Sequence, residues 1–395
     1  MIPGPYGGIN MNAVDPPQDR RRCSIRKRAR TLLRRTSLFA ALFVVLLSSF
    51  LGIPSTTKAK TAAILHDSSF SPGCNQEALS VTLGIAVYHV VGWLCYSGAI
   101  TQYDYVQVLV SGGTYDHTYW DFPTVNGIDY SYVHAMNAAG YATFNLDRLG
   151  YGLSAHPLPE LLTVQASAGV IHQIILALKA GLVGAHVFRH VILVGHSIGS
   201  AIVVAEASSY GDVNGVLLSG FLHFVDPAFA TQLATDVYPA DLDPHFSTSG
   251  LPPGYLTTRP GTRGQLFYYL PDADPQVVEM DEATKSTMTD SEVATFFSVE
   301  STPLYSIGIH VPVFIAVGQE DNIFCLGTLD CHNSAGVQAY ESLFWAPQAH
   351  LQVHVIPSAG HDLNLQENVS AWYSLAIQWM EGTFPGAQAL SPSFP

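Results

Sequence analysis

A serine framed by two glycines stands between a predicted strand and a predicted helix. Residues 195–199 read Gly-His-Ser-Ile-Gly, after an apolar, β-branched run at 190–194 and before a helix-compatible stretch at 198–207. So tight a turn leaves no room for a side chain at either glycine, because the adjoining strand and helix would clash with it. The turn also sets Ser197 at a helix N-terminus, which favours negative charge. The pattern predicts a nucleophilic serine.

A serine hydroxyl becomes a good nucleophile when a base takes its proton, and His361 is the best placed of the 16 histidines. It lies in a glycine-marked loop at 357–362, after an apolar alternation at 351–355 that predicts a last strand. A surface histidine beside Asp362 is the alternative interpretation. The rival bases are His156, His196 and His332.

A carboxylate is expected to hold this histidine in one tautomer and to stabilise its charged form. An apolar strand at 313–317 is followed by Gly-Gln-Glu-Asp at 318–321, which places Asp321 at the carboxyl end of a strand. Asp321 is therefore the predicted partner of the base. Glu320 is the near alternative and Asp330 a distant one.

The oxyanion that develops during attack on an acyl group needs two backbone N–H donors. One is predicted to come from Ile198, directly after the serine. The other is expected from the loop after the strand at 105–110, which reads Ser-Gly-Gly-Thr, with Gly113 or Thr114 as the donor. Glycines let the main chain approach a substrate closely, although an ordinary turn would have the same composition.

With serine, aspartate and histidine in this order, residues 79–381 resemble the α/β-hydrolase superfamily. Residues 147–154, Asp-Arg-Leu-Gly-Tyr-Gly-Leu-Ser, are similar to the family's D-x-x-G-x-G-x-S turn. The resemblance implies that residues 221–305 form a cap inserted before the strand that carries the acid. Two departures are visible: Ser111 replaces a common histidine, and the 40-residue interval between acid and histidine is longer than usual.

Hydrophobic patterning independently predicts an α/β fold with a mostly parallel central sheet and helices on both faces. An antiparallel pair is expected at 79–95, and the buried strands are expected at 105–110, 142–146, 191–194, 216–218 and 311–317, with a helix at 164–179. The cap should be largely helical, with helices at 275–285 and 291–299, although a separate domain is the competing interpretation. The predicted organisation is an N-terminal segment at 1–60, the α/β domain at 61–220 and 306–395, and the cap at 221–305.

Aromatic side chains crowd the region after the oxyanion loop and the cap, and predict a pocket for an apolar acyl or aromatic substrate. Such residues can equally form the cap's own small core. The predicted pocket residues are Tyr115, Tyr119, Trp120, His196 and Phe221, with further cap aromatics at Phe224, Phe229, Tyr238, Phe267, Tyr268 and Tyr269.

Basic residues are concentrated at the N-terminus, where nine of the 17 Lys and Arg precede an uncharged apolar run at 38–53. This arrangement predicts an export signal. The 16-residue run is shorter than the roughly 20 residues of a membrane span, so cleavage and secretion are favoured over a retained anchor. Beyond residue 60 the chain has 6 basic and 29 acidic residues, a balance that argues against nucleic-acid binding.

Export would let cysteines pair, because extracytoplasmic compartments are oxidising. Cys23 precedes the apolar run, and the remaining four favour the pairs Cys74 with Cys95 and Cys325 with Cys331. Four buried free thiols are the alternative. The chain has no Cys-x-x-Cys and no ligand-like histidine spacing, so no metal site and no cofactor are expected.

Together these features predict an exported serine hydrolase that cleaves carboxylic esters of small molecules through an acyl-enzyme on Ser197, and that is a monomer. The same triad also serves thioesterases, amidases, carbon-carbon bond hydrolases and haloperoxidases. A catalytically silent binding module on the same fold is the alternative from another functional class.

Overall fold

A computed structural model of the chain describes residues 73–325, 327 and 329–388. The predicted export segment at 38–53 and Cys23 lie outside these residues. Among the helices of the described part, none has both the length and the apolar character needed to cross a membrane.

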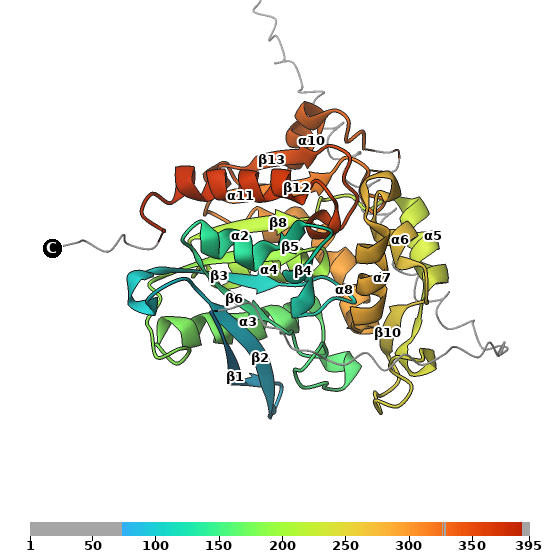
Figure 1. Ribbon diagram of the computed structural model, residues 1–395, viewed down its shortest axis with the longest axis horizontal. Helices are drawn as coiled ribbons and strands as arrows, with labels where there is room; N and C mark the ends of the chain where they lie inside the picture. The colour runs from blue at the N-terminus through green and yellow to red at the C-terminus, as the bar shows by residue number, and fades with distance from the viewer. Residues whose placement is uncertain (1–72, 326, 328, 389–395) are drawn as a thin grey trace, which may run out of the picture. The chain divides into compact units, whose positions relative to one another are not determined.

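The centre of the fold is an eight-stranded sheet with the strand order β1-β2-β6-β3-β7-β8-β12-β13 (Figure 1). Every neighbouring pair from β6 to β13 is parallel, whereas β1 pairs with β2, and β2 with β6, in antiparallel fashion. The strands are β1 (Cys74–Leu83), β2 (Ala86–Cys95), β3 (Tyr105–Val110), β6 (Ala142–Leu146), β7 (His190–His196), β8 (Gly215–Ser219), β12 (Val313–Gly318) and β13 (Gln352–Ile356).

Helices cover both faces of this sheet, as the burial of its central strands requires. Every residue of β6, β8 and β12 is buried, which is typical of parallel strands between two helical layers. On one side α3 packs against α4, and α4 against β7 and β8. α2 packs against β6 and α11. These helices are α2 (Tyr132–Ala138), α3 (Val164–Lys179), α4 (Ile198–Tyr210) and α11 (Val369–Thr383). The predicted fold class is confirmed.

The chain leaves the sheet after β8 and returns to it at β12, and the intervening residues include the cap. Asp226 and Asp274 cap the N-termini of two of its helices, each followed by a proline at the first helical position. The helices are α5 (Pro227–Asp236), α6 (Arg263–Phe267), α7 (Pro275–Thr284), α8 (Asp290–Glu300) and α9 (Pro303–Ser306). The cap also contains an antiparallel sheet of β9 (Val237–Pro239), β10 (Tyr255–Thr258) and β11 (Met288–Thr289), which hydrophobic patterning did not predict because its strands are only two to four residues long.

Two disulfides join the cysteine pairs that the sequence favours. Cys74 and Cys95 face each other in the register of β1 and β2, and Cys325 pairs with Cys331. The long interval between the predicted acid and histidine is filled by this second loop and by α10 (Ser334–Glu341). The remaining elements are a hairpin of β4 (Asp121–Val125) and β5 (Ile128–Ser131), and the 3-10 turns η1 (Ile100–Gln102), η2 (His117–Tyr119), η3 (Pro159–Leu161), η4 (Ala240–Leu242), η5 (Leu270–Asp272), η6 (Pro347–Ala349) and η7 (Leu363–Leu365).

Candidate active site

The turn between β7 and α4 holds Ser197 in a strained backbone conformation, with φ 53° and ψ −120°. A Cβ at Gly195 would lie 2.6 Å from the backbone of α4, and one at Gly199 would overlap the carbonyl oxygens of Val110 and Ser111. Only glycine fits either position, which is the physical reason for the motif. Positive φ at a non-glycine residue costs about 1–3 kcal/mol and is typical of functional sites.

His361 and Asp321 form a buried hydrogen-bonded pair, with 2.9 Å between His361 Nδ1 and one carboxylate oxygen of Asp321. The other carboxylate oxygen accepts from the N–H of Ile323 at 2.8 Å. Burial alone would lower the pKa of His361, but the charge and hydrogen bond of Asp321 outweigh it and raise this pKa above its ordinary value. Since an ionised carboxylate only accepts, Nδ1 donates and Nε2 is left as the basic nitrogen.

Ser197 and His361 both lie beside the end of β8. The N–H of Ser197 donates to the carbonyl of Ser219 at 3.0 Å, and the next residue, Gly220, packs under the His361 ring. His361 Nε2 is buried and has no hydrogen-bond partner among the described residues, the Ser197 hydroxyl included. A buried nitrogen without a partner is unusual in folded proteins, and catalytic hydrogen bonds often tighten only when substrate binds. Nε2 is thus free to take a proton.

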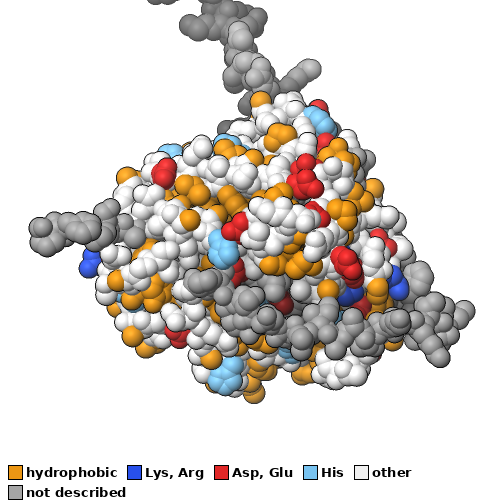
Figure 2. Space-filling view, viewed as in Figure 1, with side chains coloured by type: hydrophobic (Ala, Val, Ile, Leu, Met, Phe, Trp, Pro, Cys, Tyr) orange, Lys and Arg blue, Asp and Glu red, His pale blue; other side chains and the backbone are white. Residues whose placement is uncertain are grey.

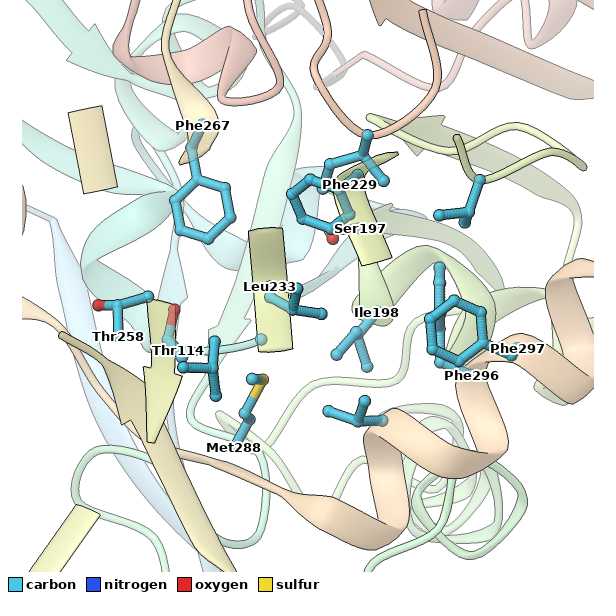
Figure 3. A pocket seen from close by; sticks show the side chains of 15 residues that line it. Thr114, Ser197, Ile198, Phe229, Leu233, Thr258, Phe267, Met288, Phe296 and Phe297 are labelled. Atoms are coloured by element: carbon cyan, nitrogen blue, oxygen red, sulfur yellow. The ribbon is translucent and has the colours of Figure 1, made fainter. Parts of the chain in front are cut away.

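Three backbone N–H groups face the same space as the serine. Those of Gly113, Thr114 and Ile198 have no acceptor in the described part of the chain. Thr114 has φ 64°, so this loop is also held in an uncommon conformation. All three residues line the pocket that contains Ser197 (Figure 3). The structure thus brings the three predicted oxyanion residues together with Ser197, and their role as donors stays a prediction.

Figure 3 shows that the pocket above Ser197 is walled mainly by apolar side chains. Together with its open mouth it comprises about 550 Å³ of empty space, and none of the described residues that line it has a charged side chain. The cap supplies most of the wall: Val225, Phe229, Leu233, Val237, Thr258, Phe267, Met288, Val293, Phe296 and Phe297, joined by Ile323. Such a wall favours an uncharged, apolar group beside the serine.

The aromatic residues predicted to line the pocket lie elsewhere, which corrects that part of the sequence analysis. Tyr115, Tyr119, Trp120, His196 and Phe221 are all buried and none borders the pocket. Tyr119 stacks on His196 with ring centroids 4.2 Å apart, and Phe221 packs behind the pocket residue Phe296. Their hydrophobicity was recognised, but periodicity carries no signal for the direction of a side chain in a loop. Phe229 and Phe267, also proposed from the sequence, do line the pocket.

Sequence reasoning missed a buried arginine that holds the oxyanion loop. Arg148 donates from Nε to the carbonyl of Ser111 and from Nη2 to that of Gly112, each at 3.0 Å. Its third nitrogen pairs with Glu292 of α8, whose other oxygen accepts from the hydroxyl of Tyr151 at 2.7 Å. The arginine stands in the recognised turn at 147–154, so the motif was a signal that could have indicated its role.

A second buried arginine approaches the same loop from α6. Arg263 donates from Nη1 to the hydroxyl of Thr114 at 2.9 Å, and its guanidinium lies 4.1 Å from the centre of the Tyr115 ring. Its other nitrogens form a two-point pair with Asp281 of α7, at 2.8 and 2.9 Å. The carbonyl of Thr114 accepts from the N–H of Ser286, also in the cap. Contacts from the cap thus fix the loop whose N–H groups face the serine.

A chain of polar side chains continues behind His361. His196 and Asp362 lie 3.1 Å apart, and Asp362 accepts a short hydrogen bond from the Tyr115 hydroxyl. Burial, with a smaller contribution from Asp281, raises the pKa of Asp362 to about 7. The pKa of His196 lies well below its ordinary value, because of burial and the proximity of His361. His196 is hydrogen-bonded to Asp362 and Ser219 behind the site.

The rival catalytic candidates lie away from this pocket. His332 is 63% exposed and forms surface ion pairs with Glu320 at 3.3 Å and Asp330 at 3.7 Å. His156 packs against the ring of Tyr255. Neither histidine, and neither alternative acid, borders the space above the serine.

Residues 107–371 match a family described as the "Alpha/beta hydrolase family". Among solved structures, the chain is similar to a soluble variant of monoglyceride lipase from Saccharomyces cerevisiae, with 15% identity, a TM-score of 0.53 and coverage of 78% of this chain and 95% of that one. A bromoperoxidase from Bacillus anthracis has 15% identity and a TM-score of 0.51, over 77% of this chain and 100% of that one. No curated protein sequence matches the chain.

Proposed function

The chain belongs to the alpha/beta hydrolase family, and from that membership and the geometry of the site we propose that it hydrolyses carboxylic esters through an acyl-enzyme on Ser197. The observation that carries the proposal is an apolar pocket that contains a strained serine and three residues whose N–H groups have no acceptor in the described structure. Behind the pocket residue Phe267 lies His361, whose basic nitrogen has no partner among the described residues. Each of these features costs stability or is rare in a resting protein, and acyl transfer uses all of them together.

In the proposed reaction the Ser197 hydroxyl oxygen attacks the ester carbonyl carbon while His361 Nε2 takes its proton. The oxyanion accepts hydrogen bonds from Ile198 and from Gly113 or Thr114. His361 then returns the proton to the departing alkoxide, which leaves the acyl group on the serine. Water, deprotonated by His361, then attacks the acyl carbon. The bond to the Ser197 oxygen breaks, His361 returns the proton to that oxygen, and the carboxylic acid leaves. Asp321 stabilises the charged imidazole in both steps.

The pocket wall supports an uncharged acyl or aromatic group as the bound part of the substrate, because its lining offers no charged partner. Phe296 stands in this wall, 7% exposed. Replacing it with alanine would enlarge the apolar space, so Phe296→Ala should shift the optimum in a series of p-nitrophenyl esters toward longer acyl chains. An unchanged chain-length profile would place the acyl group outside this pocket.

A fluorophosphonate probe tests the nucleophile directly. We expect it to label the wild type at Ser197, and Ser197→Ala to lose both labelling and ester turnover. Ser298→Ala is the matched control, since Ser298 lies exposed on α8 and should leave labelling intact. Correctly folded wild type that neither labels nor turns over short esters would refute the assignment and would favour a silent binding module.

We also propose that the protein works outside the cytoplasm, as the apolar segment at 38–53 suggests. The two disulfides support this location, because such bonds are rare in reducing compartments. Mass spectrometry of the protein from its host should find an N-terminus after residue 53. A chain found intact in the membrane fraction would point to a retained anchor, and a fully reduced cytoplasmic chain would contradict the proposal.

A further inference from the structure

Three clusters of acidic residues and histidines in the described part of the chain bring possible metal ligands within 4.8 Å of one another. The first contains His361 and belongs to the candidate active site. In the second, around His117, the carboxylate of Asp147 is satisfied by hydrogen bonds from the His117 ring and from backbone N–H groups. The third, between α3 and α4, is different because its ligand atoms have no such partners.

This third cluster consists of His172 on α3, Glu206 on α4 and Asp212, which follows α4. His172 Nδ1 lies 3.5 Å from a carboxylate oxygen of Glu206 and 3.2 Å from one of Asp212. Zinc bonds of about 2.0–2.2 Å in tetrahedral geometry place neighbouring ligand atoms about 3.3–3.6 Å apart. The two separations are close to those that a single zinc ion imposes.

All five donor atoms of the cluster are buried and lack a hydrogen-bond partner in the described structure: His172 Nδ1 and both carboxylate oxygens of Glu206 and Asp212. Glu206 is fully buried. Lys179 lies 3.9 Å from Asp212 and supplies one positive charge against two carboxylates. Burial and the neighbouring Asp212 carboxylate raise the pKa of Glu206 to about 9, so without a cation the two carboxyl groups share a proton that a bound cation would displace.

We propose that His172, Glu206 and Asp212 bind a divalent cation of the zinc type, with a water molecule as fourth ligand. A nitrogen ligand beside two carboxylates favours zinc over calcium, which takes oxygen ligands. The Tyr210 ring stacks on the imidazole, with ring centroids 3.7 Å apart and planes within 6°, and so holds Nδ1 toward the carboxylates.

The ion has a structural role. Glu206 is nine residues from Ser197, which at 1.5 Å per residue places it about 13 Å along α4 from the nucleophile. The ion cross-links α3 to the C-terminal end of α4, the helix whose N-terminus carries Ser197. The sequence alone predicted no metal site, because the ligands come from two helices and the loop after the second, and the histidine and the glutamate are 34 positions apart.

Zinc titration of the full chain, first freed of metal with a chelator, tests the site. Calorimetry should detect one tight equivalent, and Tm should rise by about 5 °C or more when free zinc exceeds its Kd about 100-fold. Glu206→Gln and His172→Ala should each abolish that equivalent and the rise in Tm. His332→Ala, which removes an exposed histidine beside two acids, is the matched control and should bind like the wild type.

Other outcomes overturn the proposal. If the wild type binds no zinc, the site does not exist. If Glu206→Gln still binds one tight equivalent, the zinc is held by surface histidines only. If Glu206→Gln raises Tm in the absence of zinc, and zinc does not change the Tm of the wild type, the two carboxyl groups share a proton and hold no ion. Should the variants fail to fold, cobalt on the wild type decides: intense visible bands of a tetrahedral ion support the site, and weak octahedral bands refute it. Ester hydrolysis lost in step with the first equivalent would place the ion at His361 instead.

Discussion

Removing the carboxylate of Glu292 tests whether the cap positions the oxyanion loop. Glu292 is fully buried and accepts from both Arg148 and the Tyr151 hydroxyl. Glu292→Gln keeps the shape of the side chain but loses its charge. Its NH₂ group cannot accept a hydrogen bond, so either Arg148 or the Tyr151 hydroxyl loses its acceptor. Arg148 would then keep a buried positive charge without a counter-ion, while still facing the carbonyls of Ser111 and Gly112.

The structure sets the expected magnitudes. Breaking a buried ion pair by removing one partner costs about 3–5 kcal/mol, and the remaining acceptor of glutamine places this variant near the lower value, about 3 kcal/mol. Loss of one oxyanion donor lowers kcat by about 10²–10³. Because Glu292→Gln loosens the loop without deleting a donor, we expect kcat to fall by about 10–100-fold. KM should change little, since Glu292 does not line the pocket.

Urea unfolding and steady-state hydrolysis of a p-nitrophenyl ester measure both effects. Glu341→Gln is the matched control: Glu341 is also fully buried and bonds to His223 and Trp345, away from the oxyanion loop. It should lose stability and keep kcat. If Glu292→Gln loses stability but keeps kcat within about 2-fold, the contacts of Arg148 support the fold only and the reasoning fails.

Three further perturbations follow from the geometry. Asp321→Asn should lower kcat by up to about 10⁴-fold. Hydrolysis rises with pH as His361 loses its proton, and Asp321 raises the pKa of His361. The pH-rate profile of the remaining activity should therefore move to lower pH in this variant. Burial raises the pKa of Glu300 to about 8. Between about pH 4.3 and 8 the folded protein therefore holds a proton on Glu300 that the unfolded chain has lost. As a result, the free energy of unfolding falls as the pH rises through this window. Glu300→Gln should remove up to about 1.4 kcal/mol per pH unit of this slope in urea titrations, and an unchanged slope would contradict it. Replacing Cys325 and Cys331 with serine should lower the free energy of unfolding by about 2 kcal/mol, because the disulfide reduces the entropy of the unfolded chain. A loss much below about 1 kcal/mol would argue against this entropic origin.

Local sequence patterns predicted the parts of the molecule that depend on local geometry. The two glycines around Ser197 are demanded by atoms of the immediately adjoining strand and helix, so the motif alone was sufficient. The helix at 164–179 was predicted with the bounds of α3, because its apolar stripe faces a single layer. Asp321 and His361 could be proposed because each follows a recognisable strand, fully buried before Asp321 and half-buried before His361.

Long-range polar pairing could not be predicted in this way. Arg148 and Glu292 are 144 residues apart, and Arg263 and Thr114 are 149 apart, so no periodicity links them. Only 6 Lys and Arg lie beyond residue 60, and on the face in Figure 2 such side chains are sparse. Two of these six, Arg148 and Arg263, are fully buried, and the composition gives no indication of this.

The contacts of the oxyanion loop with Arg263 and, through Arg148, with Glu292 have a consequence for how the cap can be exchanged. A chimera that received another member's cap would lose Glu292, Arg263 and the Ser286 N–H at once, so exchange of substrate specificity by cap grafting requires that these three groups be carried over. The same three groups tie the cap to the oxyanion loop. By contrast, α5 has a single buried side chain, Phe229, which is set in the pocket wall.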